Sequence, residues 1–250
     1  KAIRRQRQMC IRDRNKENLP EVITAVKKEN KAIVAPKRMR VTYTLTVDTN
    51  AVPAGKLVRC WLPYPRTDQT RQRDVKFISA SEPDYVLSPQ ECRHSTLYME
   101  KRAVQGEPTV FSETFEYTSC GEWHNLRAED VLPYDTTTAL YKEYTAEREK
   151  HIVFSPRLRE LAAKLTAGET NPYLKAKRIF RWINDHFPWA SAREYSTIEN
   201  IPEYVLDNRH GDCGQVSLLF ITLCRISGIP AHFQSGFMTV SYTHLTLPTN

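Results

Sequence analysis

The residues best suited to chemistry lie in the run Gly211-Asp212-Cys213-Gly214. A strongly apolar segment follows the cysteine and ends at Gly228-Ile229-Pro230, where glycine and proline are typical helix stop signals. The pattern predicts a buried helix over residues 214–227 with Cys213 at its amino end. Free N–H groups and the positive end of the helix dipole favour a thiolate there, so Cys213 is a candidate nucleophile. The alternative is a small core cysteine at the start of a buried helix.

The neighbours of Cys213 do not form a metal site. His210, Asp212 and Cys213 lie on one turn, where three ligands rarely converge on one ion, and no second ligand pair is present. We therefore predict no metal. Asp212 is expected to cap the helix or face solvent, and His210 to lie at the surface. Cys224 is about 16 Å along the helix from Cys213, too far for a disulfide, and is interpreted as a core residue.

A nucleophilic cysteine needs a base and an acid that orients it. No Asp or Glu follows Asp212 in the sequence, and the histidines after Cys213 are His232 and His244. A histidine without an orienting acid is a weak candidate for the base. The chain is therefore expected to carry the nucleophile half of a site.

The elements before this helix are of two kinds. Period-two alternation with turn residues between the runs predicts an antiparallel β-sandwich over residues 38–120. Its five strands are expected at residues 41–47, 57–62, 75–79, 96–100 and 110–117. His94 and Glu113 are isolated in this region and are interpreted as surface or structural residues.

The period then becomes helical. An irregular connector is expected over residues 121–150, followed by a partial core over 151–239. Helix start signals stand at Ser155-Pro156, Asn171-Pro172 and Asn200-Ile201-Pro202-Glu203. A first core strand is expected over 231–237. The fold class predicted is α+β, with helices packed on an incomplete antiparallel sheet.

The composition argues against two classes of protein, those that span a membrane by a helix and those that bind nucleic acid. An apolar fraction of 40% and a mean hydropathy of −0.54 are typical of a globular chain. No apolar run reaches the roughly 18 residues of a membrane-spanning helix. Residues 1–40 carry a charge of +9 and the remaining residues carry −2, so we predict no nucleic-acid binding. The cysteines form no C-x-x-C pair, and a disulfide between Cys92 and either Cys60 or Cys120 is left open.

The two ends of the chain differ from its body. Residues 1–37 are expected to be a solvated tail. Residues 5–14 and 240–250 resemble translated sequencing-adapter read-through, so we expect foreign termini on a chain truncated at its carboxyl end. No signal peptide is visible, and the compartment stays open: the protein is exported if a signal peptide precedes Lys1.

The motifs around Cys213 resemble the transglutaminase-like (papain-like) cysteine superfamily, in bacterial members with an amino-terminal β-domain. The shared pattern is Gly211-x-Cys213 at a helix start, then Arg225-x-x-Gly228-Ile229-Pro230-Ala231, then Gly236. The resemblance covers about residues 38–237. It implies hydrolysis or acyl transfer at a peptide or protein amide bond, through a thioester on Cys213.

The resemblance also carries expectations for the remaining site. The family orders its triad as Cys, His, Asp, and His232 stands where the family usually has arginine, so this fragment is expected to be inactive. Tyr195 and Trp189 are candidate oxyanion donors beside the Cys213 N–H. No acidic calcium loop is present, so no cofactor is expected. The alternative function is a non-catalytic binding or scaffolding module that retains the fold. The oligomeric state is open.

Overall fold

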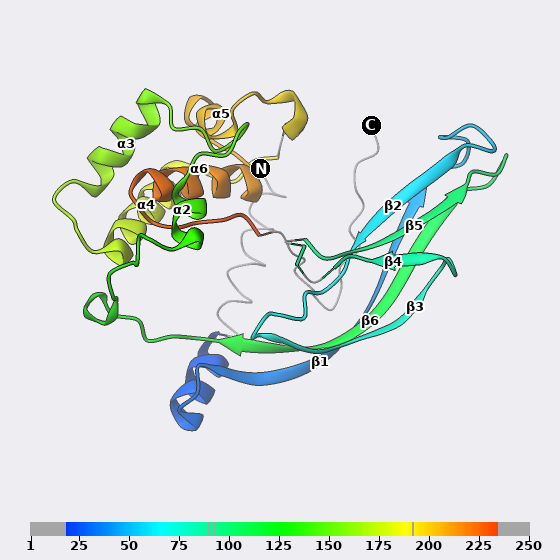
Figure 1. Ribbon diagram of the computed structural model, residues 1–250, viewed down its shortest axis with the longest axis horizontal. Helices are drawn as coiled ribbons and strands as arrows, with labels where there is room; N and C mark the ends of the chain where they lie inside the picture. The colour runs from blue at the N-terminus through cyan, green and yellow to red at the C-terminus, as the bar shows by residue number, and fades with distance from the viewer. Residues whose placement is uncertain (1–18, 90, 93, 192, 235–250) are drawn as a thin grey trace. The chain divides into compact units, whose positions relative to one another are not determined.

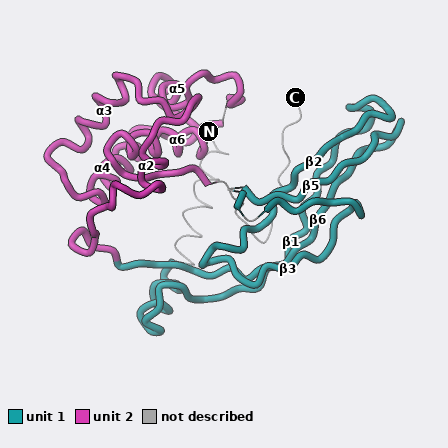
Figure 2. The backbone as a smooth tube through the Cα atoms, in the orientation of Figure 1, with its two compact units in different colours: residues 1–125 teal, residues 126–250 magenta. Residues whose placement is uncertain are grey.

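The computed structural model describes residues 19–89, 91–92, 94–191 and 193–234. The chain divides into two compact units, residues 1–125 and 126–250 (Figure 2). Both adapter-like segments, together with His244, lie outside the described residues.

The first unit, here called the β unit, holds two antiparallel three-stranded sheets (Figure 1). One sheet has the order β1-β6-β3 and the other the order β2-β5-β4. The strands are β1 Ile33–Val47, β2 Leu57–Pro63, β3 Gln72–Ala80, β4 Tyr85–Leu87, β5 Thr96–Arg102 and β6 Thr109–Glu122. All five strands that the alternation predicts are present, and β4 is an addition.

The two sheets share one apolar core. Leu62 of β2 and Met99 of β5 are buried against Phe111 of β6. Along β6 burial alternates residue by residue, because successive strand side chains point to opposite faces. The period-two pattern was therefore a sound guide to which residues enter this core.

Strand β1 begins earlier than the alternation predicts. Its first half is charged, and its outward side chains pair across to β6: the Arg38 and Arg40 guanidinium groups donate to Glu116 at 2.9 and 2.7 Å. Its register shifts between Val34 and Lys37, where Ala35 has a positive φ of 52°. Cross-strand charge pairs and a bulge hold this part of the strand, and neither leaves an apolar period in the sequence.

Residues 19–29 form a helix, although their charge pattern favours a solvated tail. Val22 of this helix packs against Gly121 near the end of β6, where a Cβ atom would meet the valine side chain. The missing side chain of Gly121 makes room for the contact.

The second unit, here called the helical unit, is built around α6. Helices α2, α3, α4 and α5 all contact α6. The elements are η1 Ala128–Asp130, α2 Ala139–Thr145, α3 Pro156–Thr166, α4 Pro172–His186, η2 Tyr195–Thr197, α5 Ile201–Asn208 and α6 Cys213–Ile226. Ser155, Asn171 and Asn200 cap α3, α4 and α5 as the start signals predict. Two short helices, η1 and α2, lie within the expected connector.

The core of the helical unit is continuous along α6. Leu219 and Leu223 are fully buried against Leu158 of α3 and Ile179 of α4. Cys224 is 1% exposed, and burial raises the pKa of its thiol to about 12, so the prediction of a core cysteine is confirmed. The α+β class is confirmed as well.

The segment that follows α6 differs from the expected strand. Residues 231–234, the described part of the expected strand 231–237, carry no strand. Among the described residues, none of the helices combines the length and the apolar character needed to cross a membrane.

The carboxyl end of α6 is held by a buried arginine. The Arg225 side chain is 5% exposed and donates from Nε to the Ala231 carbonyl and from Nη1 to the Ala146 carbonyl, both at 2.7 Å. It thereby connects the segment after α2 with the segment after α6. The Tyr141 hydroxyl of α2 donates to the Gly228 carbonyl at 3.2 Å and closes the same corner.

Replacing Arg225 by methionine should destabilise the helical unit. Arg225→Met keeps much of the apolar stem but leaves the Ala146 and Ala231 carbonyls without their donors, a loss of about 2–4 kcal/mol in unfolding free energy. Urea unfolding followed by circular dichroism at the helical band measures it. The exposed Arg181 of α4 provides the control, since Arg181→Met should change stability by less than about 0.5 kcal/mol. Equal effects of the two variants would contradict the clamp.

Glu113 lies in the middle of the inner face of β6. It is 1% exposed, and neither carboxyl oxygen has a hydrogen-bond partner among the described residues. Loss of solvation raises its pKa from an ordinary value of 4.5 to about 8, so the side chain is largely protonated at neutral pH. The residue is therefore part of the core, and its isolation in sequence concealed this.

The β unit should lose stability as the pH rises through the window from 4.5 to 8. In that window the folded Glu113 keeps a proton that the unfolded chain has released, so the folded state is penalised by up to about 1.4 kcal/mol per pH unit. Below pH 4.5 Glu113 is protonated in both states, so its burial costs no stability through ionisation. Above pH 8 it is ionised in both states, and stability falls no further. Glu113→Gln should remove this slope. Hydrogen exchange of β6 peptides, corrected for the intrinsic pH dependence, measures both proteins, and parallel profiles would refute the prediction.

Candidate functional site

Cys213 is the first residue of α6 and is exposed. The helix that the sequence predicts is therefore present, and the sulfur is open to reagents. The other free cysteines of the described chain differ: Cys60, Cys120 and Cys224 are buried, and Cys92 is exposed. Cys92 thus provides a comparison for Cys213, since it is exposed but lies in the β unit.

The start of α6 is fixed by a capping box. The Asp212 carboxylate accepts the Gln215 backbone N–H at 2.8 Å, and the Gln215 side-chain oxygen accepts the Asp212 N–H at 3.2 Å. Each residue satisfies a backbone donor that the helix leaves without a partner. The prediction that Asp212 caps the helix is confirmed.

Tyr195 of η2 lies over this cap. Its hydroxyl donates to Asp212 Oδ1 at 2.5 Å. A Cβ atom at position 214 would clash with the tyrosine hydroxyl, so Gly214 is required for the approach. Burial, together with the hydrogen bond to Asp212 and the charges of Asp212 and Cys213, raises the pKa of Tyr195 far above its ordinary value. The phenol therefore stays protonated and remains a donor.

Gln215 also connects α6 with the segment that precedes η2. The side chain is 1% exposed, and its Nε2 donates to the Arg193 carbonyl at 3.3 Å. The segment before η2 is thus tied to α6 through Gln215 as well as through Tyr195. The spacing Asp212-x-x-Gln215 is a capping-box pattern, and it is the sequence signal that identifies Gln215.

The backbone around Trp189 pairs with the backbone just before Cys213. Trp189 forms a parallel bridge with Gly211, and the Ala190 N–H donates to the Gly211 carbonyl at 3.0 Å. The indole is 39% exposed. Trp189 and Tyr195 are therefore both brought to the residues that precede Cys213, and their part as oxyanion donors stays a prediction.

The structure does not bring His232 to Cys213. His232 stacks on Tyr144 of α2, with ring centroids 5.0 Å apart, and follows Ala231, which is bonded to Arg225. Arg225 is twelve residues beyond Cys213, so this corner is about 18 Å along the α6 axis from the sulfur. A histidine side chain cannot span that distance.

His210 is closer to the cysteine along the chain. It is partly buried, and its Nδ1 has no hydrogen-bond partner among the described residues. The expectation of a surface residue therefore needs correction: Gly211, the next residue, is itself buried in the core by its bridge to Trp189. Within the described chain, no group of three or more His, Cys, Asp or Glu side chains could hold a metal ion.

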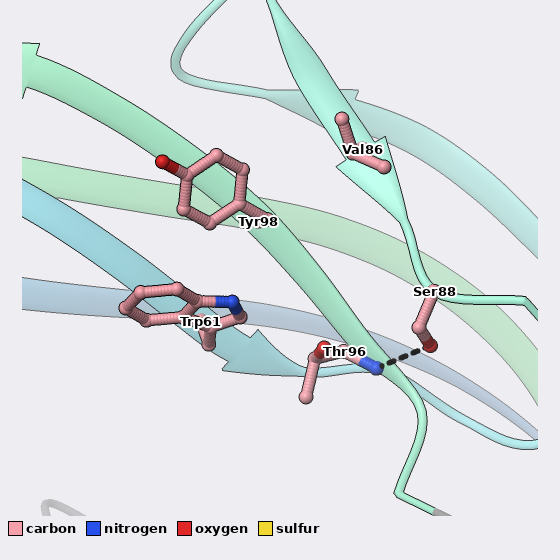
Figure 3. A pocket seen from close by; sticks show the side chains of 5 residues that line it. All are labelled: Trp61, Val86, Ser88, Thr96 and Tyr98. Atoms are coloured by element: carbon pink, nitrogen blue, oxygen red, sulfur yellow. Dashed lines mark hydrogen bonds between the residues drawn. The ribbon is translucent and has the colours of Figure 1, made fainter. Parts of the chain in front are cut away.

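A concave surface lies in the β unit. It is an open pocket of about 330 Å³ on the outer face of the β2-β5-β4 sheet (Figure 3). The rings of Trp61 and Tyr98 lie side by side with centroids 4.9 Å apart, and the Ser88 hydroxyl accepts the Thr96 N–H at 3.0 Å. The lining residues offer no nucleophile beside a base: Trp61, Val86, Ser88, Thr96 and Tyr98. The pocket lining therefore does not provide the nucleophile and base that acyl transfer requires.

Comparison with known proteins gives a match for the second unit. Residues 159–245 match the family model of the transglutaminase-like superfamily. The crystal structure of a protein from Cytophaga hutchinsonii, provisionally described as a cysteine protease, is similar with a TM-score of 0.60 and 16% identity. The match covers 79% of this chain and 66% of that chain, and at this identity it concerns the fold. A search of the curated proteins finds no match. Over residues 159–245 the chain is thus similar to the transglutaminase-like superfamily.

Proposed function

We propose that Cys213 is the nucleophile of a cysteine hydrolase or acyltransferase that opens amide bonds through a thioester. The observation that carries this proposal is an exposed thiol on the first residue of a buried, capped helix, inside the segment that matches the transglutaminase-like model. Helix packing fixes the backbone, so the sulfur has a defined position while remaining accessible. The N-terminal N–H groups of α6 favour negative charge beside it.

The reaction follows from the chemistry of a thiolate. A base takes the thiol proton, and the Cys213 sulfur attacks the carbonyl carbon. The C–N bond then breaks as the protonated base returns that proton to the leaving amine, and the acyl group stays on sulfur until water or an amine removes it. The Cys213 backbone N–H has no acceptor within the helix and is available to the oxyanion of the tetrahedral intermediate. Peptide or protein amides are the substrates that this proposal implies, and the steps require no cofactor.

A second candidate function is a binding module that retains the fold. The observation in its favour is the place of His232, at the opposite end of α6 from Cys213. A base for Cys213 is therefore a residue other than His232. We propose that this chain carries the nucleophile half of the site and is inactive toward amides by itself.

Cys213 should be the most reactive cysteine of the described chain. Iodoacetamide at neutral pH should modify Cys213 at least about tenfold faster than Cys92, because the helix end stabilises the thiolate at the first position only. Mass spectrometry of the separate peptides measures both rates in one sample. The buried Cys224 should stay unmodified while the protein is folded. Equal rates at Cys213 and Cys92 would refute the nucleophile.

An activated ester should acylate Cys213 without sustained turnover. p-Nitrophenyl acetate should release about one equivalent of nitrophenolate and leave an acetyl group on Cys213, since a good leaving group needs no acid. A simple peptide amide should be cleaved at background rates. Cys213→Ala should lose the burst, and Cys92→Ala should keep it. Continuing Cys213-dependent turnover of the amide would overturn the half-site claim, and the lack of an acetyl adduct would favour the binding module.

A further inference from the structure

The Tyr195 hydroxyl is hydrogen-bonded to the carboxylate of Asp212, the residue that directly precedes the proposed nucleophile. The hydroxyl donates to Asp212 Oδ1 at 2.5 Å, and the same oxygen accepts the Gln215 N–H at 2.8 Å. One carboxylate oxygen thus receives two donors from two different elements, η2 and α6. A hydroxyl has one proton, so Tyr195 cannot donate to a substrate oxygen while it donates to Asp212.

The position of the ring is constrained by the missing side chain at residue 214. Any Cβ atom there would collide with the Tyr195 hydroxyl. Gln215 adds a second tie, because its Nε2 donates to the Arg193 carbonyl two residues before Tyr195. The close contact with Gly214, the hydrogen bond to Asp212 and the Gln215–Arg193 hydrogen bond together fix the position of the Tyr195 ring.

The electrostatic consequence concerns Cys213. A carboxylate next to a thiolate opposes its formation, because two negative charges at short distance repel each other. The nearby ionisable side chains of the same segments have partners of their own: Arg193 donates to Thr197 at 3.1 Å and Glu194 accepts from Ser196 at 3.2 Å. His210 also lies on the loop before the cap. The Tyr195 phenol is a side-chain donor that reaches the Asp212 carboxylate from η2.

We propose that Tyr195 is a positioning residue, whose hydroxyl holds the Asp212 carboxylate in the helix cap and shares its charge, so that the Cys213 thiolate can form next to it. The inference rests on the proposed function, since it assumes that Cys213 reacts as a thiolate. It assigns Tyr195 a role through Asp212, and not a contact with the substrate.

The test removes the hydroxyl and keeps the ring. Tyr195→Phe should slow alkylation of Cys213 by iodoacetamide at neutral pH about tenfold, the effect of losing one hydrogen bond to a charged group. The pH at which the rate reaches half its maximum should move upward. The rate at Cys92 should stay unchanged in the same sample, and protection of Cys224 should show that α6 remains folded.

A second variant separates charge from structure. Asp212→Asn keeps a good capping residue but removes the charge, so the double variant Tyr195→Phe, Asp212→Asn should recover the wild-type rate and pH profile. If Tyr195→Phe leaves the rate and the profile unchanged, or if the double variant stays as slow as Tyr195→Phe, the positioning role is wrong. If Cys213 of the unmodified protein reacts no faster than Cys92, the proposed function itself has failed.

Discussion

Burial of α6 is the constraint on which the helical unit depends. Four helices pack against it, and its middle and carboxyl-terminal residues are enclosed by their side chains. An apolar helix buried in this way still has two polar ends, and each must be satisfied. Asp212 and Gln215 satisfy the first end, and the backbone N–H groups of residues 227–229 satisfy carbonyls of the last turn. The exposed thiol is held in place because everything after it in the helix is fixed.

Two buried side chains of the described residues, Arg225 and Glu113, are accommodated in opposite ways. Arg225 keeps its charge and donates to the backbone carbonyls of Ala146, after α2, and Ala231, after α6. Glu113 has no partner among the described residues and is accommodated by keeping its proton. The difference follows from intrinsic acidity, because a guanidinium group cannot release its proton at accessible pH whereas a carboxyl group can retain one.

Local patterns in the sequence predicted much of this fold. Alternation located five strands of the β unit, and Ser155, Asn171 and Asn200 marked helix starts correctly, because both signals act over a few residues. The contacts that could not be foreseen join distant residues. Tyr195 meets Asp212 across 17 positions, and Arg225 reaches Ala146 across 79. A hydrogen bond of that kind depends on how helices pack, and packing leaves no period in a single sequence.

The close approach of Tyr195 to Gly214 has a consequence for how this sequence can drift. The tyrosine ring occupies the volume where a side chain at position 214 would begin. The two positions therefore act as one steric unit: a larger residue at 214 requires the Tyr195 ring to shift or to be exchanged for a smaller side chain. Such a paired exchange would fill the space but remove the hydroxyl above Asp212. Homologues that carry alanine at 214 should thus have changed the chemistry of the cap, and not only its shape.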